Sequence, residues 1–388
     1  MKPLNPTFAG TGTTIFTVMS ALANQHGAVN LGQGFPDTDG PLALRERAAQ
    51  ALIEGPNQYP PMMGMEPLRR ALAKHAKRFY DLHYDWRSEI VVTSGGTEAL
   101  TASIMGLVKP GDEVVLIEPA YDSYRPIVEA VGGIAKPIRL KAPAWTLTEE
   151  ALASVFSPKI KAIMLNSPMN PAGKVFSKAE LELLATFLTK FDALVICDEV
   201  YEHLTFDGLK HAPFATFPGM FERCVRVGSA GKMFSLTGWK VGWVEGPAAL
   251  IGAVAKAHQF ITFTTPNALQ IAVAYGLETA EEFFLNLAKD LQGNRDYLAR
   301  ELKEIGFDPL KAQGTYFLTT DISKLRFNGS DVDFCKHMTE HARVAAIPLS
   351  VFFTGEAPQT LVRFAFCKQR NVLEEAVSRL KAHYKPRT

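Results

Sequence analysis

The 388-residue sequence has no long uninterrupted apolar run, few cysteines and almost no excess of charge of either sign. It nowhere contains the roughly 18 consecutive apolar residues that a membrane-crossing helix needs, and Pro, Gly, Thr and Asn interrupt residues 1–27 before a signal-peptide core can form. The 41 basic and 40 acidic residues leave a net charge of +1, which gives no broad field for holding a phosphate backbone. We therefore expect a cytoplasmic protein that binds neither membranes nor nucleic acid.

The four cysteines, Cys197, Cys224, Cys335 and Cys367, form no CxxC pair and no other metal-ligand spacing. A chain of this size does not depend on disulfides, so we expect reduced thiols and no metal site. With 47% hydrophobic and 21% charged residues, and with 29 glycines and 24 prolines, the composition is that of an ordinary globular protein. The length is compatible with two domains, or with one large domain and an appendage.

Short β-branched runs alternate with longer amphipathic stretches after residue 41, a pattern typical of an α/β protein. Most of the short runs are apolar on both faces, as buried parallel strands are. In the longer stretches, apolar residues recur every three or four positions, which predicts helices that include 98–108, 121–131 and 178–190. The expected strands are 89–93, 113–118, 135–140, 160–166, 193–199, 225–229 and 240–245.

The C-terminal part has a different pattern, typical of a second, smaller α+β domain. Helices are expected at 278–305, 331–342 and 371–383, and strands at 344–348 and 361–366. The opening segment has too little periodic pattern to fold alone. We therefore expect an N-terminal arm over 1–45 that packs on the small domain or on a partner chain, a large domain over 46–280 and the small domain over 281–388.

Lys232 lies in a segment, residues 229–240, that follows one expected strand and precedes another. A lysine attacks a carbonyl only after its amine has lost a proton, which partial burial or a cationic neighbour favours. Small residues flank Lys232 and would let a flat ligand approach. Considered alone, the residue is more simply explained as a solvated loop lysine.

Three further segments lie directly after expected strands. Asp198 ends one strand at the carboxyl edge of the sheet, where it could face a ligand's ring nitrogen, cap a helix or form a structural ion pair. The cluster NSPMNPAG (166–173) predicts a turn and permits a cis X-Pro bond. TSGGTEAL (93–100) runs through glycines into a helix, which favours a phosphate, but it lacks the GxGxxG spacing of dinucleotide sites.

In order and separation, SAGKMFSLTGWKVGW, VICDEVY, NSPMNPAGKV and LVRFAF resemble the class I aminotransferases of pyridoxal-phosphate fold type I. NLGQGFPD (30–37), NQYPPMMG (57–64) and the GTTIFT arm most resemble the branch with kynurenine aminotransferase, glutamine transaminase K and bacterial methionine aminotransferases. The resemblance covers nearly the whole chain. It implies a three-layer α/β/α large domain with a mainly parallel seven-stranded sheet, a smaller α+β domain, pyridoxal 5′-phosphate as cofactor and a homodimer.

The resemblance also implies roles for the catalytic residues. Lys232 would bond to the cofactor and then move the proton between the substrate α-carbon and the cofactor C4′. Asp198 would pair with the pyridine nitrogen and keep it protonated. Asn170 and Tyr201 would hydrogen-bond the phenolic oxygen and so tune the basicity of the adjacent nitrogen.

Further positions of the resemblance concern the phosphate and the ring. Gly96 and Thr97 would present backbone to the phosphate, and Ser229 and Lys240 would add a hydrogen bond and a charge. Many relatives carry Arg in place of Lys240, and lysine at this position matches the kynurenine aminotransferase branch. Tyr121 would stack on the ring, unless it is a core residue at a helix start. Tyr59 would reach the phosphate of the neighbouring subunit.

Arg363 would hold the substrate α-carboxylate as a bidentate partner, and Gly34 would approach the same group through its backbone. The alternative for Arg363 is an internal ion pair, because an unpaired guanidinium among apolar residues is costly. Aromatic candidates for the side-chain pocket, each of which could equally be core, are Phe16, Tyr121, Phe263 and Phe353, with Ile15 beside them. The stretch 258–270 contains no Arg for a second carboxylate, which argues against a strict aspartate specialist.

The leading hypothesis is a ping-pong aminotransferase that moves the amino group of an L-amino acid to a 2-oxo acid. We expect a large apolar, aromatic, sulfur-containing or glutamine side chain on the donor. Alternatives with the same cofactor are a cysteine-conjugate β-lyase, an aspartate or broad-specificity aminotransferase and a non-catalytic sensor domain. A nicotinamide-dependent oxidoreductase is disfavoured, because the sequence lacks its GxGxxG motif and acidic ribose partner.

Overall fold

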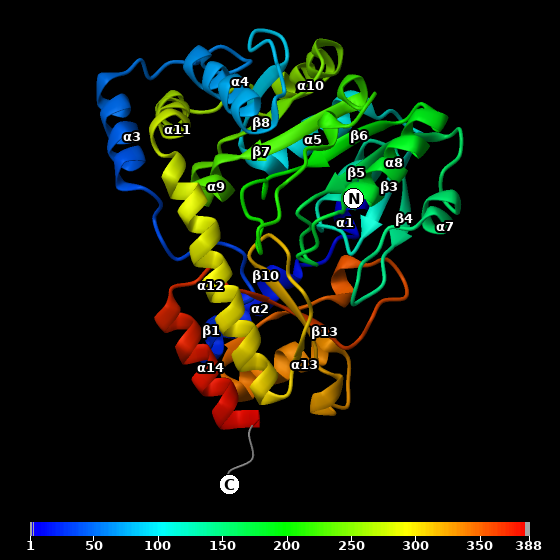
Figure 1. Ribbon diagram of the computed structural model, residues 1–388, viewed down its shortest axis with the longest axis vertical. Coiled ribbons are helices and arrows are strands. Elements are labelled where there is room, and N and C mark those ends of the chain that lie inside the picture. Colours follow the sequence, from blue (N-terminus) through cyan, green and yellow to red (C-terminus); the bar gives the residue numbers. More distant parts are fainter. Residues whose placement is uncertain (1, 3, 385–388) are drawn as a thin grey trace.

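A computed structural model describes residues 2 and 4–384, and its larger part is built on a seven-stranded sheet in the order β2-β8-β7-β6-β5-β3-β4 (Figure 1). The strands lie within two residues of the bounds predicted from the sequence. Strand β8 runs antiparallel to both of its neighbours, and the remaining pairs are parallel, so the sheet is mainly parallel as expected. The strands are β2 (Ile90–Thr93), β3 (Glu113–Glu118), β4 (Ile134–Arg139), β5 (Ile160–Asn166), β6 (Leu194–Asp198), β7 (Cys224–Ser229) and β8 (Gly242–Glu245).

Helices cover both faces of this sheet. Alternate residues of a strand enter different apolar cores: Val195 and Cys197 of β6 pack in one cluster and Ile196 in the other. The Ile196 side is covered by α5 (Gly95–Leu107), α6 (Tyr124–Ala130) and α10 (Ala248–Ile261). The opposite side is covered by α4 (Glu66–Tyr80), α8 (Lys178–Phe191) and α11 (Asn267–Thr279), with α3 (Leu42–Glu54) packed on α11 and α7 (Glu149–Ala153) beside α8.

Local signals explain where the helices begin and end. Helix α8 begins at a capping box in which the Ser177 side chain and Glu180 satisfy each other's backbone amides, and it ends at Asp192 in the left-handed conformation (φ 48°). The helix predicted over 278–305 is confirmed as α12, but it begins at Glu281, three residues later than expected, because α11 extends to Thr279. Ala280 between them has φ −118° and ψ 31°, outside helical geometry.

Helix α12 (Glu281–Ile305) runs from the sheet into the smaller C-terminal part, where it lies beside α14 (Arg370–Tyr384) (Figure 1). An antiparallel sheet in the order β12-β13-β10-β9 forms the core of this part, with α13 (Asp331–His337) against β12. The helix predicted over 331–342 is thus α13 followed by a π-helical turn, Met338–Ala342. The strands are β9 (Asp308–Pro309), β10 (Phe317–Asp321), β12 (Ile347–Pro348) and β13 (Leu361–Ala365).

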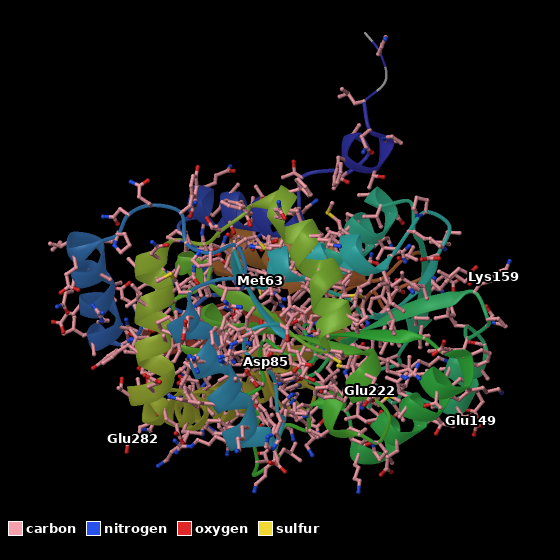
Figure 2. The ribbon with its side chains drawn as sticks, turned by 90° about the horizontal axis from the view of Figure 1, so that it is seen from above. Met63, Asp85, Glu149, Lys159, Glu222 and Glu282 are labelled. Carbon is pink, nitrogen blue, oxygen red and sulfur yellow. The ribbon has the colours of Figure 1, made fainter. Side chains whose placement is uncertain are left out.

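The N-terminal segment is more regular than its sequence suggests. Helix α2 (Ile15–His26) is capped by the Thr14 side chain and ends at Gly27, whose φ of 58° is left-handed. It packs on β12 and α13, while β1 (Val29–Asn30) pairs with β11 (Val344–Ala345). Helix α1 (Pro6–Ala9) touches α6 and stands off the body in the view from above (Figure 2). The domain limits at residues 45 and 280 remain a prediction.

None of the helices in the described part of the chain is long and apolar enough to cross a bilayer.

A buried ionic network lies around Arg226 of β7, the strand that pairs with β6 and its terminal Asp198. Arg226 of β7 donates to Glu199 (2.7 Å), Glu245 (2.9 Å) and Glu202 (3.2 Å), and all four side chains are at most 6% exposed. Burial disfavours charge on Glu199, but Arg226 and His211 outweigh it and lower its pKa to about 2. Burial raises the pKa of Glu245 to about 8, against the attraction of Arg226. One cation cannot neutralise three buried carboxylates, so Glu245 retains its proton at neutral pH.

We predict that Glu245→Gln stabilises the protein increasingly as the pH rises from 6 to 8.5. The folded-state pKa of Glu245 lies above its unfolded-state value of 4.5, so its contribution to the free energy of unfolding falls as pH rises through this window. The neutral amide avoids that loss, which is on the order of 1 kcal/mol per pH unit. The measurement is the difference in Tm between the variant and the parent across the pH range, with Glu278→Gln on the surface as control. A difference that does not change with pH would contradict the assignment.

Candidate active site

A cavity of about 380 Å³ lies where strands β5, β6 and β7 end at Asn166, Asp198 and Ser229. Parallel strands bring their carboxyl ends to one edge of the sheet, so three segments distant in sequence meet there. Of the predicted site residues, Tyr59, Phe263, Phe353 and Ile15 do not line this cavity, and the other twelve do. These residues are Phe16, Gly34, Gly96, Thr97, Tyr121, Asn170, Asp198, Tyr201, Ser229, Lys232, Lys240 and Arg363.

Lys232 projects into the cavity from α9 (Ala230–Met233), the short helix that directly follows β7. Its Nζ donates a hydrogen bond to the Tyr316 hydroxyl at 2.7 Å. Burial lowers the pKa of Lys232 to about 8, against the attraction of Cys367 and Asp198. A sizeable fraction of the amine is therefore unprotonated near neutral pH, as a nucleophile or a proton acceptor requires, and the solvated-loop alternative is wrong.

Asp198 is 5% exposed and accepts a hydrogen bond from the Tyr124 hydroxyl at 2.6 Å. Burial raises the pKa of Asp198, while hydrogen bonds from Tyr124 and the Val200 backbone and the charge of Lys232 oppose the rise. Within the described chain, no cation lies within ion-pair distance of its carboxylate. Asp198 is therefore neither a helix cap nor half of a structural ion pair, and its charge is available to a ligand.

The 166–173 turn is tied to the same strand end. The Asn166 side chain donates to the Asp198 carbonyl at 2.8 Å and accepts from the Asn170 amide at 2.7 Å. The Ser167–Pro168 and Asn170–Pro171 peptide bonds are cis. The turn therefore does more than reverse the chain, because it positions the Asn170 side chain in the cavity.

Gly95 and Gly96, which have no side chains, form one wall of the cavity. A Cβ on Gly96 would lie 3.2 Å from the Val200 side chain, and one on Gly95 would lie 3.3 Å from Lys240 Nζ. Lys240 itself has a left-handed backbone (φ 52°), which turns its side chain toward Gly95. The Ser94 side chain does not cap the first turn of α5, and the Glu98 side chain accepts from the Ser94 amide at 2.9 Å. An anion can thus approach backbone amides and a cation together, which is the environment a phosphate needs.

Arg363 is 1% exposed, and its partners are neutral: NH1 donates to Asn170 Oδ1 and NH2 to the Gly32 carbonyl, both at 2.9 Å. Its Nε is buried without a hydrogen-bond partner. No carboxylate of the described residues lies within ion-pair distance, so the internal ion pair considered above does not form. Burial lowers the pKa of Arg363 to about 10. A buried cation without a counterion is costly unless a ligand supplies the negative charge.

Three aromatic residues of the site were not among the sequence candidates. Tyr124 contacts Asp198, Tyr316 contacts Lys232, and the Phe317 ring lies 3.8 Å from the Arg363 guanidinium carbon. Phe353 and Ile15, which were expected in the pocket, pack on the main core and do not line the cavity. The only available signal was the apolar run GTYFLTTDI, in which Tyr316 immediately precedes β10 and Phe317 begins it.

Tyr59 and Phe263 lie together on the surface, with ring centroids 5.5 Å apart and exposures of 82% and 39%. Neither lines the cavity of its own chain. The role of Tyr59 at a neighbouring subunit's phosphate therefore remains a prediction.

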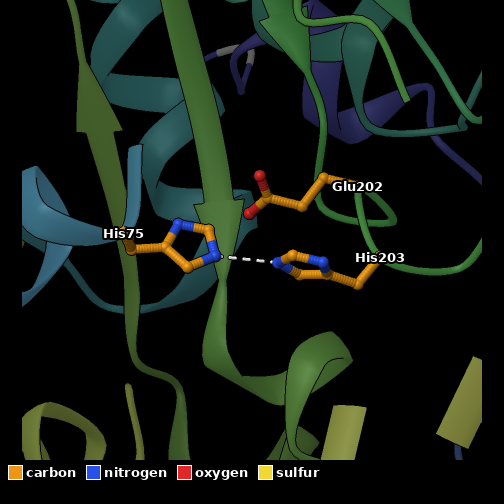
Figure 3. Close-up of side chains that lie close together, drawn as sticks. All are labelled: His75, Glu202 and His203. Carbon is orange, nitrogen blue, oxygen red and sulfur yellow. Dashed lines mark hydrogen bonds between the residues drawn. The ribbon is translucent and has the colours of Figure 1, made fainter. Parts of the chain in front are cut away.

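A second polar cluster, His75, Glu202 and His203, lies outside this cavity (Figure 3). The three side chains are close enough to share a metal ion. Their groups are already partnered, however: His75 Nε2 and His203 Nε2 lie 2.8 Å apart, and Glu202 accepts from Arg226. Burial lowers the pKa of both histidines, that of His203 to about 3, so both are neutral. The cluster belongs to the buried network around Arg226.

Comparison with known proteins agrees with this geometry. Residues 26–380 match the family described as aminotransferase class I and II. The chain is 45% identical to a probable N-succinyldiaminopimelate aminotransferase of Mycobacterium tuberculosis over 95% of both chains. The solved structure of that enzyme superimposes with a TM-score of 0.95 at 44% identity, covering 98% of this chain and all of the other. A methionine aminotransferase of Escherichia coli is 42% identical over 95% of this chain and 96% of its own. Human kynurenine–oxoglutarate transaminase 3 is 38% identical over 96% and 88%.

The fold and the cavity define a fold type I enzyme that uses pyridoxal phosphate. The chain belongs to the class I and II aminotransferases, and it is an aminotransferase of the branch that contains methionine and kynurenine aminotransferases. The residues present fit the cofactor. The glycine wall with Lys240 suits its phosphate, the uncompensated Asp198 suits a protonated pyridine nitrogen, and the amine of Lys232 suits its aldehyde.

We predict that Tyr124→Phe weakens cofactor binding more at pH 6 than at pH 8. Loss of the Tyr124 hydrogen bond removes one of the contacts that oppose the raised pKa of Asp198, so the carboxylate takes up a proton at a higher pH. A protonated Asp198 cannot neutralise a protonated ring nitrogen. Titration of the apoprotein with pyridoxal phosphate, followed by absorbance at each pH, measures the effect. Tyr384→Phe, which removes a buried hydroxyl far from Asp198 in sequence, is the control. Equal weakening at both pH values would contradict this role.

Proposed function

We propose that the enzyme transfers the amino group of an L-amino acid with a large apolar, aromatic, sulfur-containing or glutamine side chain to a 2-oxo acid by a ping-pong mechanism. The observation that carries the proposal is Arg363, a buried cation with neutral partners only. The lining supplies just two other cationic side chains, Lys232 and Lys240, which are assigned to the cofactor. The site of one chain therefore provides for one substrate carboxylate.

The rest of the lining supports an apolar side chain. Phe16 and Phe317 line the cavity beside Arg363, and Phe35 and Tyr121 add two further aromatic surfaces to the lining. The similar enzymes named above act on methionine, kynurenine and N-succinyldiaminopimelate, which share a large group beyond the α-carbon. A pocket of this kind discriminates weakly among apolar side chains of similar size, which favours several donors.

The residues that line the cavity have separate roles in the proposed reaction. When bound, the cofactor supplies an electron-accepting ring that acidifies the α-proton of the amino acid. Asp198 holds a proton on the ring nitrogen, and Asn170 and Tyr201 hold the phenolic oxygen. Arg363 orients the substrate by its α-carboxylate, and the backbone of Gly34 lies beside it. Lys232 takes the proton from the α-carbon and returns it at C4′.

We also propose that the enzyme works as a cytoplasmic homodimer in which Tyr59 completes the neighbouring subunit's phosphate site. Several large apolar side chains are exposed: Tyr59 packs on Phe263 at the surface, Ile53 of α3 is 87% exposed and Phe260 of α10 is 84% exposed. Exposed apolar side chains of this kind are typical of a subunit interface. The four cysteines are reduced and buried, which agrees with a reducing compartment.

The test of the proposed reaction is to add single amino acids to the holoenzyme without an oxo acid and to record its visible spectrum. Methionine, phenylalanine, kynurenine and glutamine should each give one equivalent of 2-oxo acid and pyridoxamine phosphate per site, at least about tenfold faster than aspartate. If aspartate reacts faster than these amino acids, the proposed substrate class is wrong. Continuous release of pyruvate and ammonia from a cysteine conjugate, with no accumulation of pyridoxamine phosphate, would make β-elimination the main activity.

We predict that Arg363→Ala lowers kcat/KM for the amino acid by about 30- to 1000-fold, equivalent to about 2–4 kcal/mol for a charge-assisted pair. Affinity for pyridoxal phosphate should change by less than about threefold, because Arg363 serves the substrate. Arg363→Lys should recover part of the activity, since it keeps the charge but loses the fork. Single-turnover kinetics and cofactor titration measure both quantities. A larger loss in cofactor affinity than in substrate use would indicate a structural role.

We predict that mixing two impaired variants, Lys232→Ala and Tyr59→Phe, restores activity at limiting cofactor. A heterodimer of the two has one site with a native Lys232 and a native Tyr59 from the other chain. Each heterodimer has one complete site of two, so the purified heterodimer should have about half of the parental activity. Co-expression with two affinity tags and assay of the doubly purified dimer measures it. Activity no higher than that of the separate variants would show that Tyr59 does not act across subunits.

A further inference from the structure

The hydroxyl of Tyr316 joins three segments of the chain. It lies 2.7 Å from Lys232 Nζ and 2.6 Å from the carbonyl oxygen of Gly34. Lys232 follows a strand of the seven-stranded sheet, Gly34 lies after β1, and Tyr316 immediately precedes β10 of the small sheet. The Tyr316 side chain is 2% exposed, so water does not compete for these bonds.

The direction of both hydrogen bonds follows from the partners. A carbonyl oxygen only accepts, so the single proton of the Tyr316 hydroxyl points to Gly34. The lone pairs of the same oxygen are left to receive a proton from Lys232. Tyr316 is thus a fixed acceptor for the amine and cannot turn its own proton toward it.

A second cavity lies next to Tyr316 and Lys232. It has a volume of about 230 Å³, and its lining includes Lys232, Tyr316, Cys367 and the unpartnered hydroxyl of Ser235. Lys232 therefore borders two spaces, the substrate cavity and this one. A lysine side chain has four rotatable bonds, and without a fixed partner its amine can move between the two.

We propose that Tyr316 is a positioning residue for proton transfer: by accepting a hydrogen bond from the amine of Lys232, it fixes that amine at the boundary of the two cavities, where it can exchange a proton with the substrate. The inference rests on the proposed function, in which Lys232 carries the proton. It adds Tyr316 to the residues that set the rate, through Lys232 and not through contact with the substrate.

The test compares Tyr316→Phe with the parent enzyme and with Tyr384→Phe, which removes another buried hydroxyl. Tyr316→Phe should lower kcat by about 10- to 100-fold while KM for the amino acid changes by less than about threefold. In the single-turnover half-reaction, the α-deuterium isotope effect should increase, because proton transfer becomes the slow step. Tyr384→Phe should leave all of these quantities unchanged.

A second readout needs no turnover. In the apoprotein, the rate at which cyanate carbamylates Lys232 is followed against pH by peptide mass spectrometry, with circular dichroism to establish folding. Loss of an acceptor that stabilises the ammonium form should move the midpoint of this profile to lower pH by about one unit. Carbamylation of exposed Lys74 serves as the internal reference.

Three outcomes are distinguishable. A lower kcat with a raised isotope effect and a shifted carbamylation profile would support the proposal. A raised KM with unchanged kcat and an unchanged profile would overturn it, because Tyr316 would then act only on the Gly34 backbone. If the parent enzyme forms no 2-oxo acid from any amino acid, the proposed function fails, and the carbamylation profile still decides whether Tyr316 holds the amine.

Discussion

The structure depends on burying three charged side chains in one cavity without pairing them. Lys232, Asp198 and Arg363 all line it, and within the described chain none has a counterion within ion-pair distance. Burying an unpaired charge is expensive, and the cost appears as pKa values moved toward the neutral form: lowered for Lys232 and Arg363 and raised for Asp198. The charges therefore remain available to a cofactor and a substrate, whose binding relieves the cost.

Neutral hydrogen bonds hold these charges in place. The Tyr124 hydroxyl donates to the Asp198 carboxylate, and the Tyr316 hydroxyl accepts from the Lys232 amine. The Asn170 side chain and the Gly32 carbonyl accept from the Arg363 guanidinium. The network around Arg226 has the opposite arrangement. Carboxylates surround this buried cation, so its charge is already compensated and is not available to a ligand. Glu199 belongs to that network and directly follows Asp198, so the paired cluster anchors the strand end that carries the unpaired carboxylate.

Much of this could be predicted from the sequence. The seven strands could be predicted because buried parallel strands are apolar on both faces. Asp198 and Asn170 could be assigned to the site because they lie at or just after the carboxyl ends of such strands. Tyr124 and Tyr316 were not found, because their partners lie 74 and 84 residues away and no local spacing marks such contacts. Helix α2 was missed because its short apolar pattern lies among Gly and Thr residues.

Reduction of the holoenzyme with borohydride, followed by peptide mapping, tests the assignment on which the site rests most directly. Borohydride makes the bond between pyridoxal phosphate and its lysine permanent, so the attached residue can be read from the peptide mass. We expect one phosphopyridoxyl group per chain on the peptide that contains Lys232. A label on another lysine, or an unlabelled protein, would contradict the site described here.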